Sequence, residues 1–211
     1  MIRVVVGVWA VVLCLLILTP SVSFAIDCDT LPPRFAFQLT PIDTFFFSGG
    51  NDCWGWVGPD GTEYALFGGQ TGIGFVNVTT GTVSDFETGP VCTWRDIKTY
   101  RHYAYEVSEC GPGMRIWDLS MLPDSAHLVA TFSNGSTRSH NLNIDTATGY
   151  AYLVRQNYTG FRIISLANPE APVELTGVLT GELHDIYARN DTVWAAEGNN
   201  HSFSIWNMAN K

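Results

Sequence analysis

The stretch that decides the fold is Arg138–Val154, with the sequence RSHNLNIDTATGYAYLV. Apolar and polar residues alternate up to Asp145, and this period of two is typical of a half-buried β-strand. A Thr-Gly turn follows, and the alternation resumes in residues 150–154. The stretch is therefore predicted to form two antiparallel strands joined by a tight turn.

The same outline recurs three more times along the chain. The first strand of each unit opens with a tryptophan or a histidine, at spacings of 40, 46 and 44 residues: Trp54, Trp94, His140 and His184. The third strand of each unit ends with a small polar residue, at spacings of 41, 47 and 42 residues: Asn77, Asp118, Ser165 and Asn207. Four short strands that repeat every 40-odd residues are the period of β-propeller blades. An ordinary β-sandwich does not predict this periodicity.

We therefore expect an all-β chain with about four blades of four antiparallel strands each. The blades are predicted to span residues 54–90, 94–134, 138–180 and 184–211. The fourth unit has three predicted strands, and a lone alternating segment at residues 35–39 is a candidate for its missing outer strand. That pairing would close a ring of four blades and cover the sheet edges. The alternative is that the chain forms the front part of a longer propeller.

The first 25 residues are predicted to be a signal peptide, which leaves residues 26–211 as the propeller domain. Arg3 supplies a positive charge, residues 4–18 are almost entirely apolar, and Ser23-Phe24-Ala25 offers a cleavage site. The apolar run is shorter than the ~20 residues of a spanning helix, which disfavours the rival interpretation as an uncleaved anchor. The chain is thus expected to be secreted, with no membrane span after the signal is removed.

The excess of acidic over basic residues limits the classes of partner that the chain is expected to bind. The formal net charge is −9, and it becomes −10 without residues 1–25, which contain Arg3 and no acid. This charge argues against nucleic acid and anionic membrane surfaces. An extracellular protein or a glycan is the expected partner.

Four cysteines remain once Cys14 leaves with the signal, and an even number in a secreted chain indicates disulfides. If Arg101 and His102 form a two-residue turn, position 92 lies opposite position 111. This register predicts a Cys92–Cys110 bridge and leaves Cys28–Cys53 as the second. A zinc site is the alternative, but the chain has no C-x-x-C pair.

Several motifs, in this order, resemble the secreted choice-of-anchor B family, whose blades carry LVIVD-type repeats. They are Asn51–Trp56, Thr93–Lys98, Gly113–Ser120, His140-Asn141 and His184-Asp185, and the likeness spans residues 35–211. The resemblance implies an extracellular β-propeller held at the surface by varied C-terminal anchors. It implies no established activity, and this chain departs from longer members in having no such anchor.

The inner strands are where a ligand is expected, because the first strand of each blade lines the central channel. The predicted ring-facing columns begin with Trp54, Trp94, His140 and His184 and continue with Gly55, Arg95, Asn141 and Asp185. The candidate ligand-binding residues are Arg95, Asp96, His140, Asn141, His184 and Asp185. No cofactor is expected, although His140 and His184 could hold a divalent metal. The alternative is that these side chains satisfy the backbone groups of neighbouring strands.

A calcium site is a weaker hypothesis. Asn141, Asn143 and Asp145 could share one face of a strand, as the oxygen ligands of a calcium loop do, but the glycine and the distal glutamate of such a loop are missing.

No nucleophile or metalloprotease motif is present, and the carboxylates Asp96, Glu106, Glu109, Asp185 and Glu197 are too dispersed to assign as an acid–base pair. We therefore expect a non-catalytic binding or adhesion module. The alternative is a hydrolase-like extracellular enzyme with an axial metal or polar site.

Five Asn-x-Ser/Thr sequons are candidate glycosylation sites. Turn positions favour Asn134, Asn157 and Asn190 over Asn200 and over Asn77, which lies on a predicted strand.

Overall fold

The computed structural model describes residues 44–211, except residues 136 and 156–159. These residues belong to the second of two compact units of the chain, residues 43–211. The predicted signal peptide, the predicted strand at residues 35–39, Cys28 and Asn157 lie outside the described residues. The predictions that rest on them stay predictions.

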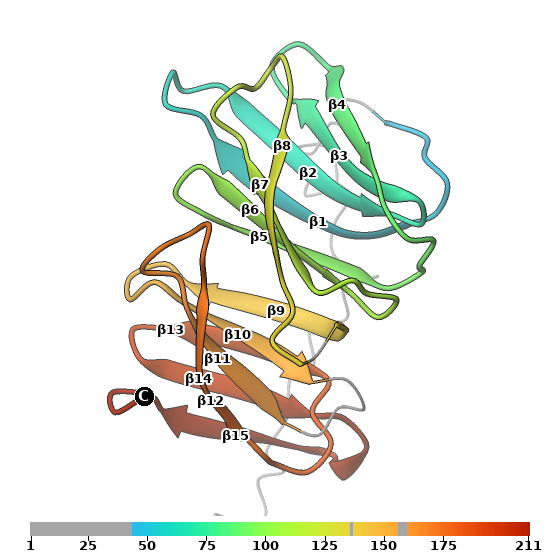
Figure 1. Cartoon of the computed structure of the whole chain (residues 1–211). Helices are drawn as coiled ribbons and strands as arrows, with labels where there is room; N and C mark the ends of the chain where they lie inside the picture. The colour runs from blue at the N-terminus through green and yellow to red at the C-terminus, as the bar shows by residue number, and fades with distance from the viewer. Residues whose placement is uncertain (1–43, 136, 156–159) are drawn as a thin grey trace, which may run out of the picture. The chain divides into compact units, whose positions relative to one another are not determined.

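The described residues form four antiparallel sheets, which we call blades one to four (Figure 1). Blade one contains β1 (Gly50–Val57), β2 (Glu63–Gly69), β3 (Gly72–Asn77) and β4 (Thr82–Thr88). Blade two contains β5 (Arg95–Tyr100), β6 (Tyr103–Ser108), β7 (Met114–Asp118) and β8 (His127–Phe132). Blade three contains β9 (Ser139–Asp145), β10 (Tyr150–Arg155), β11 (Phe161–Ser165) and β12 (Val173–Val178). Blade four contains β13 (Asp185–Arg189), β14 (Thr192–Glu197), the 3₁₀ turn η4 (Gly198–Asn200) and β15 (Ser202–Asn207).

Strands are hydrogen-bonded in chain order within every blade, so each blade is a meander. Every strand that the alternation predicts from residue 54 onward is present, and the all-β prediction is confirmed. The glycine-rich segment between β2 and β3 forms a hairpin turn in which Gly69 pairs with Gly72.

The predicted register of the β5–β6 hairpin is confirmed, since Tyr100 pairs with Tyr103 across the Arg101-His102 turn. Arg101 adopts a positive φ of 57°, as a tight turn of this kind requires. The hairpin brings Cys92 and Cys110 to a Cα–Cα distance of 5.7 Å, and they form the predicted disulfide. Cys53 is exposed and has no disulfide partner among the described residues, so its predicted bridge to Cys28 stays a prediction.

The core consists of three apolar clusters, and each one joins two successive blades. Trp56, Leu66 and Phe75 of blade one pack against Ile97 and Trp117 of blade two. Blades two and three share a cluster that contains Tyr105, Ile116, Leu142, Leu153 and Ile164. Blades three and four share one that contains Tyr152, Phe161, Ile163, Val193 and Ala195. Burial of apolar area between sheets therefore supplies the main driving force that holds the blades together.

A buried cluster of charged side chains includes Arg95 of β5, the inner strand of blade two. Arg95 and Glu106 are almost fully buried and form an ion pair. The same carboxylate accepts hydrogen bonds from Nη2 of Arg115 (2.7 Å) and from Nε1 of Trp117 (3.1 Å). The Arg95 guanidinium also donates to the carbonyl oxygens of Gly69 (3.0 Å) and Pro90 (2.7 Å). Two buried arginines thus depend on one glutamate for charge compensation.

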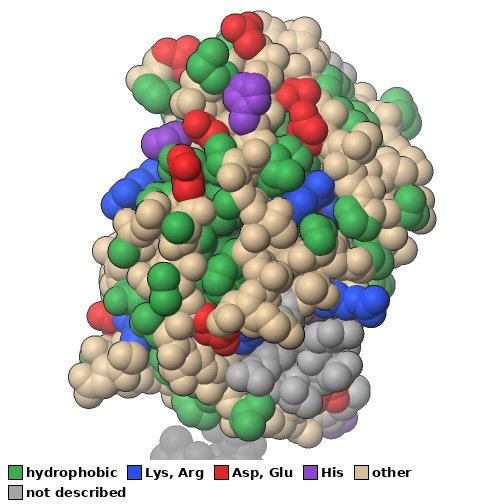
Figure 2. Space-filling view, in the orientation of Figure 1, with side chains coloured by type: hydrophobic (Ala, Val, Ile, Leu, Met, Phe, Trp, Pro, Cys, Tyr) green, Lys and Arg blue, Asp and Glu red, His purple; other side chains and the backbone are tan. Residues whose placement is uncertain are grey.

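Acidic side chains gather toward the upper part of the face in Figure 2, over the first two blades, with hydrophobic side chains interspersed. This surface fits the excess of acidic over basic residues in the composition. No helix among the described residues is long and apolar enough to span a bilayer.

The described sequons differ in accessibility. Asn134, Asn190 and Asn200 are exposed, whereas Asn77 is buried on β3 and accepts a hydrogen bond from the backbone of Thr80 (3.0 Å). Glycosylation itself stays a prediction.

We expect Glu106→Ala to lower the free energy of unfolding by about 3–5 kcal/mol, because it leaves two buried guanidinium groups without their counter-charge. Urea unfolding followed by tryptophan fluorescence measures the effect. Glu63→Ala is the matched control, since Glu63 is an exposed glutamate on the corresponding strand of blade one and should change stability by no more than about 0.5 kcal/mol. A loss below about 1 kcal/mol for Glu106→Ala would contradict the role assigned to the ion cluster.

Candidate functional site on the inner strands

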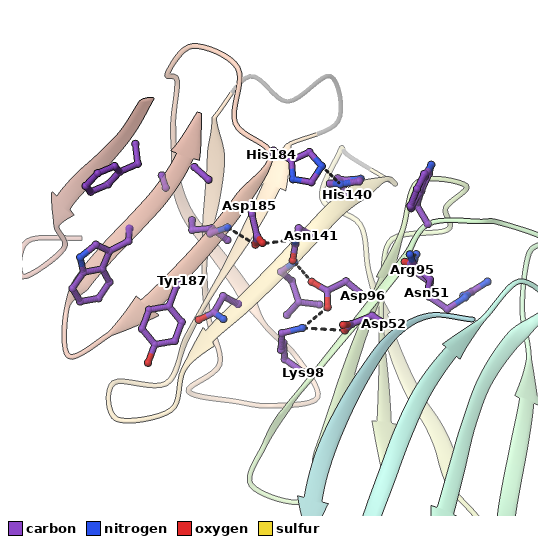
Figure 3. Close-up of a pocket in the computed structure, with 18 residues that line it drawn as sticks. Asn51, Asp52, Arg95, Asp96, Lys98, His140, Asn141, His184, Asp185 and Tyr187 are labelled. Carbon is purple, nitrogen blue, oxygen red and sulfur yellow. Dashed lines mark hydrogen bonds and ion pairs between the residues drawn. The ribbon is translucent and has the colours of Figure 1, made fainter. Parts of the chain in front are cut away.

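A pocket of about 810 Å³ lies along the inner strands β1, β5, β9 and β13, each of which neighbours the next (Figure 3). All six predicted ligand-binding residues line it: Arg95, Asp96, His140, Asn141, His184 and Asp185. The structure therefore brings together residues from three blades that lie up to 90 positions apart in the sequence. Whether they bind a ligand stays a prediction.

Sequence reasoning missed the contribution of blade one. Asn51 and Asp52 line the pocket, whereas Trp54 and Gly55, predicted for that column, are not among its lining residues. The register of β1 shifts between Gly50 and Cys53, which changes which residues reach the pocket. The signal that could have found them is an acid or amide at regular spacing, because Asp52, Asp96, Asn141 and Asp185 follow one another at 44, 45 and 44 residues.

Several polar side chains of the pocket bond to the backbone of the next inner strand. An inner strand is the edge of its sheet, so every second N–H group has no partner within the blade. The side-chain oxygen of one blade accepts these N–H groups from the next: Asp52 from Ile97 (3.1 Å), Asp96 from Leu142 (2.6 Å) and Asn143 from Ala188 (2.9 Å). The predicted alternative, in which polar side chains satisfy neighbouring backbone groups, therefore describes these three residues.

Two carboxylates and one lysine lie together on the pocket wall. Lys98 Nζ donates to Asp52 (3.1 Å) and to Asp96, and Figure 3 shows it between the two carboxylates. Burial raises the pKa of Asp96 to about 8, and the neighbouring Asp52 adds to this rise, while the Lys98 charge and the Leu142 N–H oppose it. Burial also acts to raise the pKa of Asp52, but hydrogen bonding with Asp96 and the charge of Lys98 lower it on balance. The pair therefore holds one proton, on Asp96, near neutral pH.

The histidines meet at one end of the pocket. The two Nε2 atoms of His140 and His184 lie 3.3 Å apart, and Nδ1 of His140 lies 2.7 Å from Oε1 of Glu109. Because a carboxylate only accepts, Nδ1 of His140 carries the proton, so a neutral His140 accepts the Nε2–H of His184. The ring of Trp94 lies edge-on to His140, with centroids 6.0 Å apart.

Sequence reasoning did not assign Glu109 to this cluster. Its position follows from the adjacent Cys110, whose disulfide to Cys92 holds the β6–β7 turn beside the start of β5, and from the Glu109 N–H bond to the carbonyl of Trp94 (3.3 Å). The sequence signal that could have placed Glu109 near the inner strands is its position next to Cys110, which was predicted to bridge to Cys92.

Asn141 and Asp185 form an accessible polar pair on the pocket wall. Asn141 Nδ2 donates to Asp185 Oδ1 (2.9 Å), and the same oxygen accepts the N–H of Ile186 (2.7 Å). Arg95 also lines the pocket, but its guanidinium is committed to the buried ion cluster. The groups that can face a ligand directly thus include Asn141, Asp185 and the two histidines.

Metal chemistry finds limited support in this arrangement. Within residues 44–211, as far as they are described, no group of three or more His, Cys, Asp or Glu side chains converges to hold a metal ion. Asn141, Asn143 and Asp145 do lie on one face of β9, but each of them bonds to Asp185, Ala188 or Asp191 of blade four and its neighbouring turn. The side-chain oxygens of Asn143 and Asp145 therefore serve the contact between blades, to which Asn141 contributes its amide nitrogen.

No protein-family model matches the sequence, and no curated protein matches it either. Many solved structures resemble the fold. Hydrazine synthase of Kuenenia stuttgartiensis matches with a TM-score of 0.55 at 12% identity, over 72% of this chain and 45% of that one. The Cps50 (Swd1) β-propeller domain of Myceliophteria thermophila matches with a TM-score of 0.57 at 11% identity, over 72% and 52%. The computationally designed Ika4 protein matches with a TM-score of 0.51 at 8% identity, over 69% and 86%.

These similarities show the fold alone, since all identities are low. The described residues form four antiparallel sheets, and the all-β fold matches β-propeller domains over about 70% of the chain. The chain spans about half the length of the first natural propeller chains that it matches.

We expect stability to depend on pH through Asp96. Its folded pKa of about 8 lies above the ordinary value of 3.8, so its contribution is complete below about pH 4 and is lost as the pH rises through 8. The free energy of unfolding should fall between pH 5 and 8 by up to about 1.4 kcal/mol per pH unit. Urea unfolding at several pH values measures this slope.

Asp96→Asn should flatten that slope, because asparagine has no proton to lose. Asp124→Asn, which removes an exposed carboxylate outside the pocket, should leave it unchanged. The same slope in wild type and Asp96→Asn would show that Asp96 does not hold the proton.

Proposed function

We propose that this β-propeller is a non-catalytic binding module that takes a neutral glycan in the pocket along its inner strands. The observation that carries the proposal is the accessible Asn141–Asp185 pair in the same pocket as the half-exposed ring of Trp94. Amide and carboxylate groups are suited to sugar hydroxyls, and an aromatic ring offers an apolar surface for the sugar face. The pocket volume of about 810 Å³ is adequate for a short oligosaccharide.

The electrostatics of the pocket favour a neutral ligand over an anionic one. Its positive groups are both paired with carboxylates, Arg95 with Glu106 and Lys98 with Asp52. Asp185 adds an exposed negative charge. An anionic ligand would therefore compete with these carboxylates for either cation, and the net charge of −9 would repel it.

An extracellular setting belongs to the same proposal. The signal-like pattern of residues 1–25 and the Cys92–Cys110 disulfide support it, because disulfides persist mainly in oxidising compartments. The order of motifs along residues 35–211 supports membership of the choice-of-anchor B family, and the propeller fold is the one that this family implies. The proposed role is then recognition at a cell surface or in the extracellular medium.

A second candidate function rests on the contact between Glu109 and His140. A histidine oriented by a carboxylate is the arrangement of a general base, and a second imidazole lies 3.3 Å away. This arrangement of Glu109, His140 and His184 would suit an extracellular hydrolase with a polar site or a weakly held metal. A panel of esterase and glycosidase substrates, with and without Zn²⁺, tests it. Turnover that disappears in His140→Ala would replace the binding proposal.

We expect the full chain to bind members of an immobilised panel of neutral oligosaccharides. Asp185→Ala should weaken binding of the best member about 5- to 100-fold, since a buried sugar hydroxyl would lose its partner. Trp94→Ala should weaken it as well, whereas His127→Ala, on the outer strand β8, should not. Calorimetry with that oligosaccharide measures the affinities. No binding to any member, or equal affinity in Asp185→Ala, would contradict the proposal.

A further inference from the structure

Blade one holds a cation with two side chains of its inner strand β1. Asp52 accepts a hydrogen bond from Lys98 Nζ (3.1 Å), and the same ammonium lies over the ring of Trp54, 4.7 Å from its centroid. Asp52 and Trp54 are two positions apart on β1, whereas Lys98 comes from β5 of blade two. A carboxylate next to the face of an aromatic ring is thus a cation site in this fold.

The inner strand of blade four repeats this pair of side chains. Asp185 belongs to the same regularly spaced series of acid and amide positions as Asp52, and Tyr187 follows it by two residues. Figure 3 shows Asp185 and Tyr187 on the same strand. Blade four is the last blade among the described residues, so no strand corresponding to β5 brings a lysine to this pair.

The strand register supports the correspondence between Tyr187 and Trp54. The row of paired residues that begins at Trp54 ends at Phe75 on the third strand of blade one. The row that begins at Tyr187 ends at Ile205 on the third strand of blade four. Phe75 and Ile205 each lie two positions before the last residue of their strand. The two aromatic rings therefore occupy equivalent places in their blades.

Blade four adds further aromatic rings around its acid. The ring of Trp194 lies 5.7 Å from that of Tyr187, at an angle of 38°. The exposed Ala196 pairs with Asp185 on one side and with Phe203 on the other. Two strand spacings, or about 10 Å, thus separate the backbones at Asp185 and Phe203, with only a methyl group between them. All five residues line the pocket.

The hydrogen-bond acceptors at the two sites favour different kinds of cation. Lys98 Nζ donates to Asp52 (3.1 Å), to Asp96 and to the carbonyl oxygen of Ile97 (2.9 Å), which satisfies the three N–H groups of a primary ammonium. On blade four, Oδ1 of Asp185 already accepts two hydrogen bonds. A quaternary ammonium has no N–H group, so it requires a negative charge and aromatic faces rather than three acceptors.

The charges around this part of the pocket suit a cation. Asp185 is exposed and forms no ion pair with another described residue. The net charge of −9 attracts cations to the chain as a whole. Arg189 is on the same strand, four residues from Asp185 and thus about 13 Å along it. That separation exceeds the Debye length of about 8 Å at physiological salt, so Arg189 is largely screened.

We propose that blade four binds a quaternary ammonium group of a small organic cation between Asp185 and Phe203. The rings of Tyr187 and Trp194 contact the methyl groups of this cation, as the ring of Trp54 contacts a lysine in blade one. The inference does not depend on the neutral glycan proposed above. The two sites share Asp185, but the cation site does not use Trp94.

Calorimetric titration of the full chain with choline tests the proposal. The comparison ligand is the neutral carbon isostere of choline, in which a tert-butyl group replaces the trimethylammonium group. Choline should bind at least about 10-fold more tightly than the isostere, and its affinity should fall between about 50 mM and about 500 mM NaCl. No binding of choline, or equal affinity for both ligands, would refute the proposal. Neutral oligosaccharides that still bind would then leave the glycan proposal intact.

Three variants locate the cation within the pocket. Trp194→Ala and Phe203→Ala should each weaken choline binding about 5- to 30-fold, because each removes an aromatic face. Asp185→Asn should weaken it to a similar extent and remove most of its salt dependence, because asparagine keeps the size and one oxygen but not the charge.

Phe46→Ala is the matched control for the loss of a ring, since Phe46 is 92% exposed and lies outside the pocket. It should leave the affinity for choline unchanged. Phe203 is 68% exposed, so Phe203→Ala should keep the urea midpoint of the wild type even if Trp194→Ala does not. A choline affinity that neither Phe203→Ala nor Asp185→Asn lowers would place the cation elsewhere and overturn the proposal.

Discussion

The structure depends on how an inner strand satisfies its free backbone edge. In an isolated sheet, the N–H groups of that edge would have only water as a partner, and here the next blade excludes part of that water. Asp52, Asp96 and Asn143 solve the problem by accepting an N–H from the neighbouring blade. These bonds also set the register between blades, because a side chain reaches the correct N–H only at one offset of the two strands.

This solution determines the chemistry that is left for function. Some of the residues predicted to bind a ligand instead form the contacts between blades. Arg95, for example, forms an ion pair with Glu106. What remains accessible is a small set that includes Asn141, Asp185 and the histidine pair. A pocket of this kind suits recognition by hydrogen bonds, and the paired carboxylates beside Lys98 contribute more to stability than to chemistry.

The same repeat also explains the distribution of side-chain size. On the second strands, the larger Leu66, Tyr105 and Tyr152 face the next blade, whereas Ala104, Ala151 and Ala195 face the preceding one, so successive sheets interlock. Such an interface is directional and can be extended by any blade of the same design. On blade four, which no further blade follows among the described residues, Trp194 and Ile205 are 36% and 61% exposed.

The sequence by itself determined the strands, the number of repeated units and the Cys92–Cys110 bridge, because these follow from local alternation and from the register of one hairpin. It also singled out six residues that line the pocket, whose role in binding stays a prediction. Only the tertiary structure decided that Asn51 and Asp52 line the pocket, that Glu109 contacts His140, and that Arg95 forms an ion pair with Glu106. The physical reason is that alternation is a property of one strand, whereas contacts between blades depend on offsets that a bulge in β1 and loops of unequal length can change by several residues.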